Sequence, residues 1–123
     1  MNNFKQLQEY FKSKIGKELK VTDGEAVKLV TLDTVDLHQI GVKQYIDLYF
    51  TYKKSTIKIV LACDVDNDAF IVCVNGDFGC LLTGSFNFNE LDKFSTELKR
   101  YLIVFTNSVE QYTELRDLDL HWK

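Results

Sequence analysis

The sequence predicts an α+β protein with an N-terminal helix, an antiparallel meander of about five strands, and one or two C-terminal helices packed on the sheet. Three observations support this fold class. Apolar residues recur with a helical period at both ends of the chain and with a strand period between residues 26 and 84. An Asn-Gly pair separates two apolar runs, which is typical of a hairpin. The 123 residues contain no proline, which favours one domain over residues 1–123.

The composition is that of an ordinary globular domain and argues against two classes of partner. Hydrophobic residues make up 46% and charged residues 27%, and the net charge is −3. No apolar run reaches membrane-spanning length and no basic stripe stands out, so we expect neither a membrane nor a nucleic acid as partner. The N-terminus lacks an apolar secretory signal, which favours a cytoplasmic location. Cys63, Cys73 and Cys80 are expected to be reduced thiols.

The first segment predicts an amphipathic helix of about three turns. Phe4, Leu7, Phe11 and Ile15 recur at intervals of three and four residues and form one apolar stripe. Gly16 is expected to end the helix, because glycine readily adopts the left-handed conformation found there. The stripe is interpreted as core packing.

Alternating apolar residues predict the strands of the meander. The segment 33–41 has too few apolar residues to fix a period and is interpreted as a loop with at most one helical turn. A turn over 53–56 would pair Tyr52 with Ile57 and Phe50 with Ile59, and would place both pairs on the core face. The predicted strands cover 26–32, 42–52, 56–63, 69–75 and 79–84.

The last third of the chain returns to the helical period. Asn89 is an expected N-cap, and apolar residues follow at helical spacing as far as Leu115. The β-branched and polar residues of 103–108 favour a break near 106–108, which would give two helices.

An acidic turn between two strands is the most distinctive local feature. Asp64, Asp66 and Asp68 lie within five residues, so their charges repel one another unless water, a metal or a cationic partner offsets them. The spacing matches the first half of a calcium-binding EF-hand loop. The match fails at Ala69 and Asn75, where such a loop needs glycine and glutamate, so no metal or other cofactor is expected.

Strand order predicts that the acidic turn, the 33–42 loop and the start of the last helix share one end of the sheet, the acidic pole. The sheet face opposite the core is predicted to carry Tyr45, Asp47, Tyr49, Val60, Ala62, Phe70 and Val72. Either the C-terminal segment covers that face, or a partner or second copy of the chain does. We predict that a basic protein partner contacts these two surfaces through Asp33, Asp36, Tyr45, Asp47, Tyr49, Asp64, Asp66 and Asp68.

Catalytic chemistry finds little support in the sequence, and no catalytic residue is assigned. His38 and His121 lie in no recognisable motif. Cys63 could pair with His38, but nearby carboxylates would raise the pKa of the thiol, the wrong direction for a nucleophile. A small hydrolase that uses a carboxylate pair stays an alternative.

In its small size, acidic pole (Asp33, Asp36, Asp64, Asp66, Asp68) and aromatic–acidic set (Tyr45, Asp47, Tyr49), the chain resembles bacterial immunity proteins of contact-dependent growth inhibition systems. The resemblance implies a non-enzymatic protein that neutralises a cognate toxin, such as a nuclease. The helices at the two ends also resemble those of type III secretion chaperones, although the helix expected in the middle of the sheet is missing. This second resemblance implies a homodimer.

Overall fold

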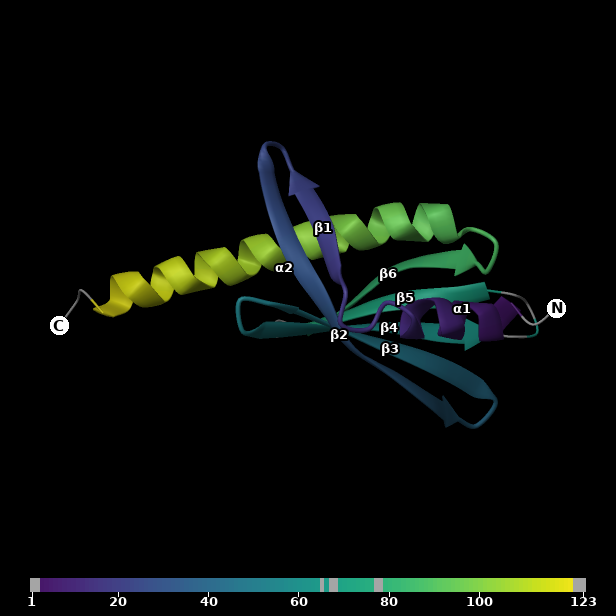
Figure 1. Cartoon of the computed structure of the whole chain (residues 1–123). Coiled ribbons are helices and arrows are strands. Elements are labelled where there is room, and N and C mark those ends of the chain that lie inside the picture. The colour runs from purple at the N-terminus through teal and green to yellow at the C-terminus, as the bar shows by residue number, and fades with distance from the viewer. Residues whose placement is uncertain (1–2, 65, 67–68, 77–78, 121–123) are drawn as a thin grey trace.

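Two helices and a six-stranded antiparallel sheet make up the chain (Figure 1). The computed structural model describes residues 3–64, 66, 69–76 and 79–120, and their side chains except those of 3, 75–84 and 112–120. Each strand pairs with the next one along the chain, which confirms the predicted α+β meander. The elements are α1 (Asn3–Lys12), β1 (Glu18–Asp23), β2 (Ala26–Ile40), β3 (Lys43–Tyr52), β4 (Ser55–Asp64), β5 (Ala69–Gly76), β6 (Gly79–Asn87) and α2 (Leu91–Leu120).

The sixth strand is β1, which lies before the first predicted strand. It pairs with the first part of β2 through a tight turn at Gly24, whose φ of 63° is easily adopted by glycine. Only Leu19 and Val21 mark the strand, with polar residues between them. Two alternating residues are too few to show a period, although the Asp23-Gly24 pair is a turn signal.

The predicted loop over 33–41 is wrong, because this segment continues β2. The pairing of β2 with β3 shifts register between Leu32 and Thr34, so Asp33 forms a bulge. Val30 and Leu32 face the core before the bulge, and after it Val35 is opposite the buried Leu48 of β3. The bulge therefore changes the phase of the alternation, which is why the sequence shows no single period across this strand.

The β3–β4 hairpin turns more tightly than predicted. Tyr52 pairs with Ser55 and Phe50 with Ile57, a register two residues away from the predicted one. The loop consists of Lys53 and Lys54 alone, with φ of 47° and 68°. Two successive residues with positive φ make a hairpin turn whose twist matches that of the strands. Residues other than glycine seldom adopt this left-handed conformation. A shift of two residues keeps the side chains of β3 and β4 on their predicted faces, so the core assignment of these two strands is confirmed. Phe70 and Val72 of β5 were predicted on the opposite face, which is wrong, because they pair with Cys63 and Leu61 and are buried in the core.

Both helices pack on the same face of the sheet. Phe4, Leu7 and Phe11 of α1 are buried there, as predicted, and Phe11 contacts Phe94 of α2 with ring centroids 6.0 Å apart. Ile15 is exposed instead, because α1 ends at Lys12 and the stripe ends with it. The buried residues of both helices and of the sheet form one core.

The C-terminal helix α2 is continuous over 30 residues, so the predicted break near 106–108 is wrong. The hydroxyls of Thr106 and Ser108 donate to backbone carbonyls one turn earlier in the helix. Both hydroxyl groups are therefore hydrogen-bonded within the helix, and the helix continues without a break. At about 45 Å the helix is longer than the ten-residue strands at about 33 Å, and its C-terminal end extends past the sheet (Figure 1).

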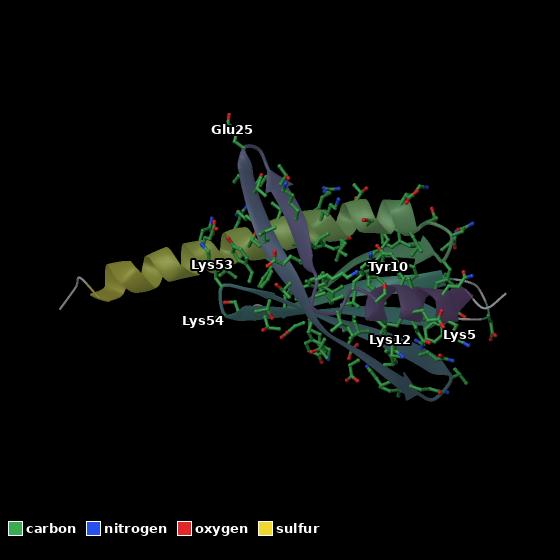
Figure 2. All side chains as sticks on the ribbon, in the orientation of Figure 1. Lys5, Tyr10, Lys12, Glu25, Lys53 and Lys54 are labelled. Atoms are coloured by element: carbon green, nitrogen blue, oxygen red, sulfur yellow. The ribbon has the colours of Figure 1, made fainter. Side chains whose placement is uncertain are left out.

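A polar cluster on α2 fastens the helix to three parts of the sheet. Glu110 accepts hydrogen bonds from the Tyr52 hydroxyl at 2.7 Å and from Lys28 at 3.2 Å, and Lys53 lies 3.5 Å away. Lys28 is 8% exposed and also donates to Asn107. Figure 2 shows Lys53 on the side of its hairpin that faces α2. The polar residues that favoured a break in the sequence thus anchor the helix. We call Lys28, Tyr52, Lys53, Asn107 and Glu110 the α2 anchor.

The cysteines differ from the expectation of three reduced thiols. Cys63 is free and buried on the core face, and burial raises the pKa of its thiol to about 12. Cys73 is disulfide-bonded. Because disulfides are rare in cytosolic proteins, the cysteines give no support to a cytoplasmic location, which stays a prediction. In the described part of the chain, no helix is long and apolar enough to cross a membrane.

The α2 anchor generates a prediction about stability and pH. Glu110→Gln removes the charge that pairs with the buried Lys28, so we expect a loss of about 1–2 kcal/mol in unfolding free energy at pH 7. The Tyr52 hydroxyl, and then Lys28, hold the pKa of Glu110 below its usual value. A carboxyl group with a lowered pKa stabilises the fold above its unfolded pKa, and that contribution disappears as the pH falls through the folded pKa.

Urea unfolding at pH 7 and at about pH 3.5 measures both effects. The two proteins should differ at pH 7, and the difference should be smaller at the lower pH, where Glu110 of the unfolded chain is mostly protonated. Glu97→Gln is the matched control on the same helix, because Glu97 pairs only with the exposed Arg100 and should contribute less than about 0.5 kcal/mol. Equal losses in the two variants would contradict an anchoring role for Glu110.

Candidate functional site

The predicted acidic pole exists only in part. Asp64 and Asp66 are exposed at the end of the sheet where β4 leads into β5, and Asp68 lies outside the described residues. Asp33 lies elsewhere, because its carboxylate accepts a hydrogen bond from Thr51 at 3.3 Å. Thr51 is seven residues along β3 from Gln44, the partner of Cys63, a distance of about 23 Å. Asp36 lies within β2, so neither it nor Asp33 joins the acidic turn.

The start of α2 does lie at the end that carries the acidic turn. Asn87, the last residue of β6, pairs with Ala69, the first residue of β5. Glu90 precedes the first helical residue, so it takes the N-cap position that was predicted for Asn89. Its carboxylate accepts a hydrogen bond from the backbone N–H of Asn87 and another from Lys93, both at 2.9 Å. These contacts lower the pKa of Glu90, the Asn87 bond most.

The sheet face opposite the helices, which we call the open face, has no helix on it in the described part of the chain. Of the two alternatives left by the sequence, cover by the C-terminal segment is therefore wrong. Alternation along the strands places four exposed apolar side chains on this face: Val27, Leu29, Ile40 and Ile71. Single exposed apolar residues are common, but several on one uncovered sheet face are typical of an interaction surface.

Asp47 lies in the middle of the open face and is nevertheless 2% exposed. Its Oδ2 is 2.9 Å from His38 Nε2 and 3.5 Å from Lys58 Nζ. An ionised carboxylate only accepts hydrogen bonds, so Nε2 carries the proton of that contact. Oδ1 is buried and has no hydrogen-bond partner. Asp36 is directly opposite Asp47 on the neighbouring strand, and like charges in that position are unfavourable.

Two tyrosines enclose this carboxylate. Tyr45 stacks on the His38 ring, with centroids 4.9 Å apart and an angle of 8° between the planes. Lys58 lies over the Tyr49 ring at 5.9 Å from its centroid. Both tyrosines are half-buried, so each still presents part of its ring to solvent. We call Asp36, His38, Tyr45, Asp47, Tyr49 and Lys58 the Asp47 cluster.

The structure therefore brings together four of the eight predicted partner-binding residues. Tyr45, Asp47 and Tyr49 are neighbours on the open face, and Asp36 joins them across the β2–β3 pair. His38 and Lys58 were not predicted as partner-binding residues. Strand alternation could have placed both residues on the face of Asp47. For His38 this alternation was obscured by the bulge at Asp33, which changes the phase along β2.

The chemistry of the Asp47 cluster suits binding better than bond cleavage. A carboxylate beside a histidine can orient that histidine as a general base. Catalysis by such a pair also needs a nucleophile within reach of the histidine. The Cys63 thiol is on the other face of the sheet and its pKa of about 12 keeps it protonated. Among the described residues, no three histidine, cysteine, aspartate or glutamate side chains are grouped as metal ligands.

The orphaned oxygen of Asp47 leads to a prediction about stability. Removing one partner of an ion pair is costly when the other partner is buried, but the side chains of His38 and Lys58 are 38% and 35% exposed, so water can solvate them after the change. We expect Asp47→Val to raise the unfolding free energy by up to about 1 kcal/mol, because valine needs no hydrogen bonds and suits a strand. Urea unfolding measures the change, with Asp36→Val as the exposed cross-strand control, expected within about 0.5 kcal/mol of the wild type. A clear loss in Asp47→Val would mean that this carboxylate serves the fold.

Comparison with known proteins adds no assignment to this geometry. No family model, no curated protein and no solved structure matches the chain. The function is therefore argued from the open face and the Asp47 cluster.

Proposed function

We propose that this chain is a non-enzymatic binding protein that holds a basic protein partner on its open face, as an immunity protein that blocks a bacterial toxin would. The observation that carries the proposal is Asp47, a buried carboxylate with an unpartnered oxygen on a sheet face that no helix covers in the described part of the chain. A buried polar atom without a partner destabilises a fold. A cationic side chain of the partner would supply the missing hydrogen bond once the side chains that now bury Oδ1 move aside.

The surroundings of Asp47 have the make-up of an interface centre. Tyr45 and Tyr49 flank it, and tyrosine is among the residues that contribute most to binding when a partner buries them. The exposed Val27, Leu29 and Ile71 extend the apolar surface on the same face. Acidic side chains at the margin, Asp36 and Asp64, would meet basic groups of the partner.

Charge favours a basic partner over a second copy of the chain. In a symmetric dimer the same patch meets itself, so the Asp36 and Asp47 carboxylates of two copies would face one another. Such like-charge contacts are unfavourable when desolvated. The homodimer of the chaperone-like alternative would appear as a dimer in sedimentation of the chain alone, and a stable dimer that buries the open face would overturn the immunity proposal.

The function is tested by co-expression in bacteria with the toxin domain encoded beside this chain's gene. The proposal expects restored growth and a complex between the two purified proteins. The absence of a toxin gene beside this chain's gene would count against the proposal. So would a toxin that stays active in the presence of the chain.

The aromatic anchors generate a prediction about affinity. We expect Tyr45→Ala and Tyr49→Ala each to weaken the toxin complex about ten- to thirtyfold, mainly by faster dissociation. Surface plasmon resonance measures both rates. Tyr10→Ala is the matched control, because Tyr10 is 49% exposed and lies on the helix side of the sheet. An equal loss in all three variants would place the interface elsewhere.

The acidic turn generates a prediction about the rate of association. We expect Asp64→Asn with Asp66→Asn to slow association with a basic toxin several-fold at low salt, because complementary charge speeds encounter. The difference should shrink at about 0.5 M salt, where charges are screened. Dissociation should change little. An association rate that is unchanged at low salt would show that the turn does not steer the partner.

A further inference from the structure

A cavity of about 490 Å³ lies on the helix side of the sheet, where α1 ends. Its walls come from both helices and from the first three strands. The size falls in the range of small-molecule sites in proteins. Because the cavity and the open face lie on opposite sides of the sheet, this site is independent of the proposed partner-binding surface.

The cavity changes from apolar to polar along its depth. The buried residues that line it are all apolar: Phe11, Leu32, Phe50, Phe94 and Leu98. The exposed residues that line it are mostly polar or charged: Tyr10, Lys14, Lys17, Glu18, Asp92 and Ser95. A site of this kind fits a molecule with an apolar body and one polar head.

The charges at the mouth favour an anionic head. Among the described residues, neither Lys14 nor Lys17 has a carboxylate within ion-pair distance, and Lys14 lies over the Tyr10 ring at 5.4 Å. Asp92 is in the first turn of α2, where the positive end of the helix dipole already stabilises its charge. Glu18 also lines the mouth, but it lies outside ion-pair distance of both lysines. Lys14 and Lys17 are therefore cations that an anionic ligand head can pair with.

The lysine side of the mouth is held in place by the backbone. The N–H of Gly16 donates to the carbonyl of Leu32 at 2.7 Å, and the N–H of Leu32 donates to the carbonyl of Lys17 at 3.1 Å. Gly16 has a φ of 81°, which lets the chain turn from α1 towards β1. These two bonds extend the β1–β2 pairing up to the cavity. The segment with both lysines is thus positioned before a ligand arrives.

We infer that this cavity binds a small amphipathic anion, an unbranched apolar chain with a carboxylate head. The apolar chain enters between Phe11, Phe94 and Leu98, and the carboxylate stays at the mouth beside Lys14 and Lys17. Hydrophobic burial supplies most of the affinity, and the two lysines select the charge of the head.

The test is isothermal titration of the full chain with sodium decanoate. We expect saturable binding of one decanoate per chain, about fourfold weaker for each methylene removed from the ligand. Lys14→Ala and Lys17→Ala should each weaken binding about threefold, and roughly tenfold together. Ser95→Trp places an indole at the mouth and should abolish binding.

Lys12→Ala is the matched control, because it removes the same charge from the same helix. Lys12 leaves α1 on the side away from Tyr10 (Figure 2) and does not line the cavity. The affinity of the Lys12→Ala variant for decanoate should equal that of the wild type. Three outcomes would overturn the inference: no saturable binding of decanoate, tighter binding of decylamine than of decanoate, or an equal loss in the Lys12 and Lys14 variants. Circular dichroism of each variant separates loss of binding from loss of folding.

Discussion

The placement of α2 across one face of the sheet is the constraint on which the rest of the structure depends. The helix contacts both edge strands, β1 and β6, and its Phe94, Leu98 and Leu102 complete the core. Burial of apolar side chains supplies the driving force, but burial alone does not fix the position of a helix along its axis. Glu110 does, since it accepts hydrogen bonds from donors on β2 and β3 that meet only at this point.

Because both helices occupy one face, the other face of the sheet is left uncovered in the described part of the chain. An ordinary solvated face carries polar side chains at alternate positions. This one carries Tyr45 and Tyr49 around a buried Asp47, with exposed apolar residues beside them. A carboxylate with an unpartnered oxygen is unfavourable for the fold. In the proposed complex, a cationic group of the partner would complete the hydrogen bonding of this carboxylate.

On the other side of the sheet, the short length of α1 leaves room for a cavity. It covers the sheet only as far as Lys12, after which the chain turns at Gly16 towards β1. The space between that turn and α2 is lined by core residues below and by lysines at the mouth. We propose a basic protein as the partner of the open face and a small anion as the ligand of the separate cavity. The two sites share no residue, so each can be tested without the other.

The sequence by itself determined the α+β class, the meander and the core face of β3 and β4, because hydrophobic period and face depend only on local alternation. It did not reveal the bulge at Asp33, which reverses the alternation halfway along β2. It also suggested a break in α2 that long-range contacts from Lys28 and Tyr52 prevent. Only the tertiary structure decided which predicted residues meet. Asp36 joined Tyr45, Asp47 and Tyr49, while Asp33 separated from the acidic turn, because strand register and not sequence proximity sets distances across a sheet.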